Sequence, residues 1–251
     1  MQAHKPARKF SGLRERAQHS LMVRKAPPMR AVLYPPVSPL IFSFRSQNFV
    51  ARSRCARMCV AESSALLPEH RMSLTELKAS LPDYAKDLRL NLDSVLNESG
   101  APGLSTKQIF LIALASAIGS RYSPLTQPIA EETAKVADAA EIGGAKAAAA
   151  IMSMTNIYYR FTHLVSEKDY AILPARLRIN VMANPGGDKI DFELCSLAVS
   201  AINGCGMCLD SHEKVLRNHG LTTQTIQSAV RIGAVVNAAA VILEQNAALT
   251  S

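Results

Sequence analysis

Two cysteines and a histidine stand at a spacing that suits redox chemistry. Cys205 and Cys208 are three positions apart, and His212 follows Cys208 by four. If a helix begins at or just before Cys205, side chains at these spacings share one face and can meet. The helix N-terminus and a nearby imidazole both favour the nucleophilic thiolate. We therefore interpret the motif first as a dithiol that closes to a disulfide and opens again.

The same three residues could instead bind zinc. They would supply three ligands, with Glu193 or a water molecule as the fourth. A structural zinc site usually contains a second pair of Cys or His ligands, and none is formed by the remaining cysteines, Cys55, Cys59 and Cys195. A static structural disulfide is the third interpretation. It fits poorly, because 5 cysteines in 251 residues are sparse and odd in number, unlike a secreted disulfide framework.

The elements that position these residues are predicted to be helices. The chain is 48% hydrophobic and 5% aromatic, lacks Trp and is rich in Ala, which suits closely packed helices better than strands. Capping boxes open two helices, at Ser73 and at Ser105. Further helices are expected over 128–139, 145–160, 188–202, 205–220 and from 222 onward. No βαβ pattern surrounds the CxxC, so the sequence predicts an all-α fold rather than a thioredoxin fold.

The charge divides the chain into two parts. Residues 1–71 contain 13 Lys and Arg against 3 acids, whereas residues 72–251 contain 15 against 17, so the net charge of +8 belongs to the first part. That part also holds 7 of the 13 prolines and shows no sustained periodicity. We predict a basic, disordered extension over 1–71 and one helical domain over 72–251. The extension could be a targeting segment, a nucleic-acid contact or untranslated upstream sequence; we favour the last, with Met72 as the native start.

Neither a membrane nor a nucleic acid is an expected partner of this chain. The longest apolar stretches, 109–118 and 235–243, are shorter than a bilayer requires, so we predict no membrane association. No nucleic-acid-binding motif accompanies the basic segment. The sparse cysteines point to a reducing, cytoplasmic setting.

Glu193, the Cys205-Gly206-Met207-Cys208 tetrapeptide and His212 lie in a longer pattern that resembles a known family. With the surrounding ELCSLAVSAING, they are similar to the AhpD-type alkyl hydroperoxide reductases of the carboxymuconolactone decarboxylase-like superfamily. The resemblance includes 72–87, 150–160 and 177–186, and so covers essentially all of 72–251, whereas 1–71 match nothing comparable.

The resemblance implies an all-helical, homotrimeric antioxidant peroxidase with no bound metal or flavin. Cys208 would be the thiol that becomes a sulfenic acid, and Cys205 would donate a proton and then close the redox disulfide. His212 and Glu193 would form the proton relay. Electrons would come from dihydrolipoamide on a lipoyl-bearing dehydrogenase-complex subunit, and they would pass to hydroperoxides or to a peroxiredoxin of the alkyl hydroperoxide reductase C type.

Two residues qualify this resemblance. Some family members carry a histidine immediately before the second cysteine, where this chain has Met207, which cannot transfer protons. The residues alone favour a solvent-facing Glu193 on an amphipathic helix, whereas the resemblance places it in the relay. Decarboxylase-like chemistry, also found in the superfamily, is an alternative that the CxxC does not favour.

Overall fold

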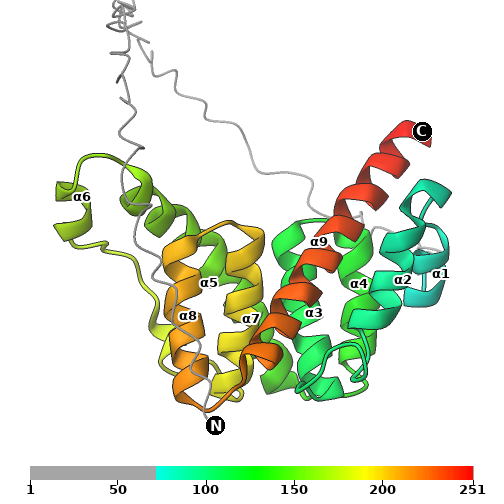
Figure 1. Cartoon of the computed structure of the whole chain (residues 1–251), viewed down its shortest axis with the longest axis horizontal. Coiled ribbons are helices and arrows are strands. Elements are labelled where there is room, and N and C mark those ends of the chain that lie inside the picture. The colour runs from blue at the N-terminus through cyan, green and yellow to red at the C-terminus, as the bar shows by residue number, and fades with distance from the viewer. Residues whose placement is uncertain (1–71, 251) are drawn as a thin grey trace, which may run out of the picture. The chain divides into compact units, whose positions relative to one another are not determined.

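The structure is a computed structural model, and it describes residues 72–250 (Figure 1). Helices and short 3-10 turns follow one another along the chain. They are α1 (Leu74–Ala79), η1 (Asp83–Ala85), α2 (Lys86–Val95), α3 (Thr106–Ser120), α4 (Ser123–Thr133), α5 (Ala139–Leu164), α6 (Asp169–Ile172), η2 (Asn180–Met182), α7 (Lys189–Ile202), α8 (Gly206–Asn218) and α9 (Thr223–Thr250).

The predicted all-α class is confirmed, since residues 72–250 contain helices and no strand. Both predicted capping boxes are present. The Ser73 hydroxyl accepts from the backbone N–H of Glu76, and the Ser105 hydroxyl accepts from that of Gln108; each Glu or Gln side chain accepts in return from the backbone N–H of the serine. The extension predicted for 1–71 lies outside the described residues.

The helix boundaries predicted between 128 and 160 are wrong. Helix α4 begins five residues earlier, at Ser123, and contains Pro128, and it ends at Thr133 rather than at 139. Helix α5 begins at Ala139, so Gly143-Gly144 lies inside it instead of before it. Asp138 explains the difference, because its carboxylate accepts from two backbone N–H groups of the first turn and starts the helix ahead of the glycines.

Helix α7 lies at the centre of the core and packs against α3, α5, α8 and α9. Every residue from Asp191 to Ser200 is buried, and Figure 1 shows α7 in yellow between α8 and α9. Small residues permit this close packing. A Cβ atom on Gly233 of α9 would lie 3.2 Å from the carbonyl oxygen of Ala198, so a larger residue there would push α9 away from α7.

A buried carboxylate fixes the first turn of α7. The Asp191 Oδ1 atom accepts from Gln108 Nε2 at 2.8 Å, and Lys107 Nζ lies 3.7 Å from Oδ2. Lys107 also pairs with Glu141 at 2.5 Å, so the cluster joins α3, α5 and α7. Burial raises the pKa of Asp191, because the ionised form loses solvation, although the hydrogen bond from Gln108 opposes this effect.

We expect Asp191 to make the free energy of unfolding depend on pH. The folded state holds the Asp191 proton more tightly than the unfolded state, so stability is highest below the unfolded pKa and declines as pH rises through the folded pKa. Urea unfolding of the parent and of Asp191→Asn should show the parent losing stability relative to the variant from about pH 3 to about pH 7. A difference that stays constant over this range would contradict the prediction.

Helix α9 is long and apolar enough to cross a bilayer by length and composition. It is the one such helix within the part of the chain that the structure describes, and half of its most apolar window is buried inside the protein. The buried face includes Ile226, Ile232 and Val236 and packs on α2, α3 and α7. A core helix of a globular protein passes the same test, so this helix is weak evidence for a membrane span.

Candidate redox site

The CxxC motif lies at the N-terminus of α8, as the sequence predicted. Cys205 is the N-cap residue, and Cys208 lies in the first turn. A tight turn precedes them, in which Gly204 adopts a φ of +66°, a conformation that favours glycine. The backbone N–H of Cys205 donates to Ser200 at 3.1 Å, and the carbonyl of Cys205 accepts from Leu209 at 3.0 Å. The first turn of α8 therefore presents its N–H groups and the positive end of the helix dipole beside the sulfur atoms.

Cys205 and Cys208 are joined by a disulfide in this structure, with their Cα atoms 5.3 Å apart. That separation is in the usual range for a disulfide. The two cysteines differ in their surroundings. Cys205 is fully buried, whereas Cys208 is 7% exposed and lines a cavity. A small molecule in the cavity can therefore contact Cys208 but not Cys205.

Glu193 and His212 form a buried pair next to this disulfide. The Nδ1 atom of His212 lies 2.6 Å from Oε2 of Glu193, and both residues are almost completely buried. Glu193 comes from α7 and His212 from α8, one turn beyond Cys208. The solvent-facing interpretation of Glu193 is wrong. Although its neighbours in sequence are apolar, its carboxylate points at the imidazole, which compensates for the loss of solvation.

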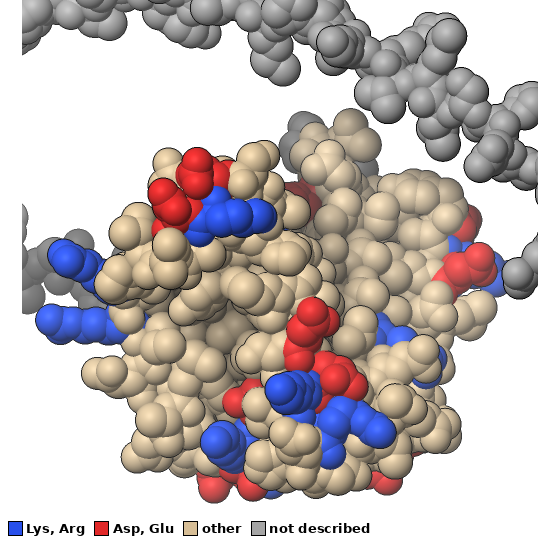
Figure 2. Space-filling view, turned by 60° about the vertical axis from the view of Figure 1, so that its left-hand side comes forward, with Lys and Arg blue, Asp and Glu red and all other residues tan. Residues whose placement is uncertain are grey.

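The cavity beside Cys208 and His212 has a volume of about 280 Å³. Its wall is mainly apolar and contains three methionines. The lining residues are Met152, Thr155, Tyr159, Ile179, Met182, Met207, Cys208, Ser211 and His212. Figure 2 turns the side of α6 and α8 forward and shows a hollow among uncharged side chains, with a group of acidic and basic side chains beside it. An apolar wall with few polar groups is typical of a small-molecule site.

Met207 contributes to this wall and is 38% exposed. It occupies the position where some members of the resembling family carry histidine. A thioether holds no exchangeable proton, so Met207 itself cannot transfer protons to or from the cavity.

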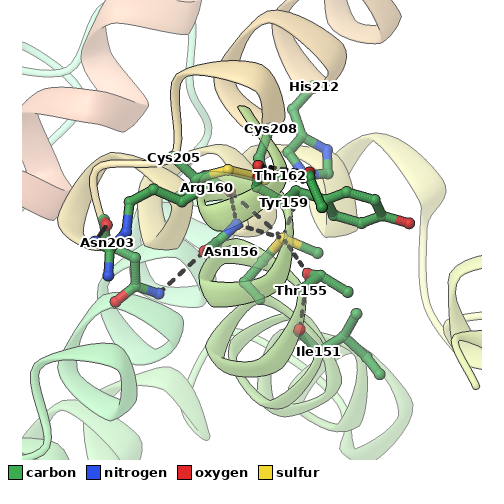
Figure 3. The surroundings of a disulfide bond; sticks show 12 residues. Ile151, Thr155, Asn156, Tyr159, Arg160, Thr162, Asn203, Cys205, Cys208 and His212 are labelled. Carbon is green, nitrogen blue, oxygen red and sulfur yellow. Dashed lines mark hydrogen bonds between the residues drawn. A yellow bond between two sulfur atoms is a disulfide. The ribbon is translucent and has the colours of Figure 1, made fainter. Parts of the chain in front are cut away.

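The sequence did not identify a set of buried polar residues on α5 and α7 that surrounds the site (Figure 3). Met152 places its sulfur 3.3 Å from Nε2 of His212, on the side opposite Glu193. Asn156 is fully buried and contacts Ser200 and Asn203. One signal was available: Asn156 is a lone amide inside the Ala- and Met-rich run of α5, and a buried amide needs hydrogen-bond partners.

The remaining cysteines and possible metal ligands form no second redox or metal site within the residues that the structure describes. Cys195 on α7 is buried and has a free thiol, as expected for a small hydrophobe, and burial raises its pKa far above the usual range. Within residues 72–250, no group of three or more His, Cys, Asp or Glu residues is arranged to hold a metal ion. Cys55 and Cys59 lie outside the described residues.

Comparison with known proteins gives a consistent set of relatives. The model of the Carboxymuconolactone decarboxylase family matches residues 168–250, which include Glu193, both cysteines of the CxxC and His212. Alkyl hydroperoxide reductase AhpD of Brucella abortus (strain 2308) is 52% identical over 173 residues, covering 69% of this chain and 97% of the relative. AhpD of Hyphomonas neptunium is 54% identical over 180 residues, or 72% and 98% of the two chains. AhpD of Rhodospirillum centenum is 52% identical over 179 residues, or 71% and 95%.

Proposed function

This chain belongs to the AhpD family of alkyl hydroperoxide reductases, and from that premise we propose that it is a thiol peroxidase and thiol–disulfide oxidoreductase that cycles Cys205 and Cys208. One observation carries the proposal. The Cys205–Cys208 disulfide borders an apolar cavity and lies beside a buried carboxylate–imidazole pair. These are the parts that a dithiol needs in order to bind an organic peroxide, ionise and transfer protons.

In the oxidative half-reaction, the thiolate of Cys208 attacks one oxygen of a hydroperoxide that has entered the cavity. The O–O bond breaks, an alcohol leaves after taking up a proton, and Cys208 becomes a sulfenic acid. The thiol of Cys205 then attacks the Cys208 sulfur, the S–O bond breaks, and water leaves. The net change converts a hydroperoxide and two thiols into an alcohol, water and the disulfide.

His212 and Glu193 would transfer the protons of both steps. The imidazole Nδ1 is held by Glu193, which fixes the orientation of the ring. A histidine one turn after Cys208 can accept the thiol proton through water and return it to the leaving oxygen, and the positive end of the α8 dipole stabilises the resulting thiolate.

In the reductive half-reaction, a dihydrolipoyl group reduces the disulfide. A lipoyl thiolate attacks one sulfur of the pair, a mixed disulfide forms, and the second lipoyl thiol closes the lipoyl ring and releases the protein dithiol. The donor would be carried by a lipoyl-bearing dehydrogenase-complex subunit. The reduced pair could then pass its electrons to the disulfide of a peroxiredoxin of the alkyl hydroperoxide reductase C type.

Three further properties are proposed on the family resemblance. The protein would be a cytoplasmic homotrimer and would need neither a membrane nor a nucleic acid. Exposed apolar side chains on α5, α6 and the following residue supply surface for contacts between subunits: Ile157, Phe161, Leu164, Tyr170, Ile172 and Leu173. The decarboxylase alternative has less support, because the disulfide and the carboxylate–imidazole pair fit thiol chemistry.

The test is a peroxide-reduction assay with dihydrolipoamide as the electron donor, with and without a peroxiredoxin of the C type. We expect slow consumption of an alkyl hydroperoxide by the protein alone and faster consumption with the peroxiredoxin. The Cys208→Ser variant is the negative control. If the parental protein consumes the hydroperoxide no faster than this variant under both conditions, the proposed function is contradicted.

A further inference from the structure

A row of side chains on α5 runs beside the redox pair. Met152, Asn156 and Arg160 are spaced by four residues, so they lie one above the other on the same face of the helix. Met152 is next to His212, Asn156 is fully buried in the middle, and Arg160 reaches the protein surface. Figure 3 shows this face of α5 below the disulfide and the turn that precedes it.

Asn156 joins α5 to both ends of the segment that leads into the CxxC. Its Nδ2 group donates to the Ser200 hydroxyl at 3.0 Å, near the end of α7. Its Oδ1 atom accepts from Asn203 Nδ2, also at 3.0 Å, in the turn before Cys205. Because the amide is fully buried, it has no water with which to replace a lost partner. These hydrogen bonds therefore restrict the position of the turn.

Arg160 holds the same turn from its exposed side. Its Nη1 group donates to the carbonyl oxygen of Asn203 at 2.5 Å. The next residue, Gly204, has the left-handed φ of +66°, and the N–H of Cys205 then returns to Ser200. The turn thus makes two hydrogen bonds with side chains of α5, one as donor to Asn156 and one as acceptor from Arg160, in addition to its backbone bonds to α7.

We propose that Asn156 and Arg160 are positioning residues that hold the Asn203–Gly204 turn, and so keep Cys205 at the distance from Cys208 that favours the disulfide over the dithiol. This inference rests on the proposed function, because it concerns the redox equilibrium of that pair. In the dithiol no covalent bond links the two sulfurs, so only the turn and α8 keep them close. Loosening the turn gives more conformational freedom to the dithiol than to the disulfide, and therefore shifts the equilibrium toward the dithiol.

The experiment equilibrates the full chain with mixtures of reduced and oxidised dithiothreitol. Each exchange moves two electrons and two protons: the protein disulfide becomes two thiols as dithiothreitol closes to its cyclic disulfide. Alkylation after acid quenching gives the fraction of dithiol. We expect Asn203→Ala, Arg160→Met and Asn156→Ala each to shift this equilibrium toward the dithiol, with about a tenfold change, or about 30 mV, for Asn156→Ala.

A double variant and a stability control separate positioning from general weakening of the fold. Asn156→Ala with Asn203→Ala should shift the equilibrium by little more than the larger single change, because both remove the same hydrogen bond. Thr133→Val removes a fully buried hydroxyl from α4, remote in sequence from the motif, and should lower the melting temperature without moving the equilibrium. If Asn156→Ala does not fold, Asn203→Ala and Arg160→Met decide the question, since both sites are at least partly exposed.

Two results would overturn the inference: folded variants that keep the parental equilibrium, or a Thr133→Val shift as large as theirs. A strictly additive double variant would also count against the Asn156–Asn203 bond as the cause. A different result would contradict the proposed function itself: a parental Cys205–Cys208 pair that does not interconvert between dithiol and disulfide at any ratio of reduced to oxidised dithiothreitol.

Discussion

Replacing Cys208 with serine is expected to abolish peroxide-dependent turnover. A serine hydroxyl is not ionised near neutral pH and cannot form a sulfenic acid or a disulfide, so both half-reactions are lost. The fold should persist, because Cys208 contributes a small buried side chain at the start of α8. The measurement is alkyl hydroperoxide consumption with dihydrolipoamide, together with the melting temperature. Residual turnover above the rate without protein would contradict the role assigned to Cys208.

Cys205→Ser should stop the cycle at a different point. Cys208 would still react with a hydroperoxide, but no second thiol would be present at its side to close the disulfide. The variant should therefore accumulate a Cys208 sulfenic acid or a mixed disulfide, which mass spectrometry detects after trapping with a sulfenic-acid reagent. Cys195→Ala is the matched control, since this buried thiol is not in the disulfide and does not line the cavity. It should keep parental turnover.

Glu193→Gln is expected to slow turnover by about 10²-fold, the usual contribution of general acid–base help. Glutamine has nearly the same size and can still accept from the imidazole, so the pairing with Nδ1 of His212 can persist. It carries no charge and takes up no proton, so it cannot stabilise a protonated imidazole as the carboxylate does. Turnover should be measured from about pH 6 to about pH 9, across the range in which His and Cys titrate.

His212→Gln should cause a loss of similar or larger size, because it removes the imidazole to which we assign the proton transfer. Glu213→Gln is the control for both variants. It changes a carboxylate next in sequence to His212, but this side chain is half-exposed on α8, and its Oε1 atom lies 3.9 Å from Nε of Arg217. Its turnover should remain parental. A Glu193→Gln enzyme that works at the parental rate over the whole pH range would show that Glu193 has only a structural role.

The sequence located the redox motif because its spacing is a local property. Residues three and four positions apart share a helix face wherever the helix lies, so the grouping of Cys205, Cys208 and His212 required only that α8 begin where it does. The two capping boxes could also be recognised in the sequence, because each involves only an N-cap serine and a Glu or Gln three positions later. The boundary of α5 was missed because a glycine pair suggested a break, whereas the Asp138 cap decided the start of the helix.

The sequence by itself therefore determined the helical class and the grouping of the two thiols with the imidazole, which depend on composition and on contacts within one helix. Only the tertiary structure decided that Glu193 faces inward. Its partner is 19 positions away on another helix, and a single charged residue among apolar neighbours gives no sign of which way it points. The cavity and the Asn156 contacts could not be predicted from the sequence for the same reason. They arise where α5, α7 and α8 pack together, and packing of separate helices depends on the whole set of buried side chains rather than on any local pattern.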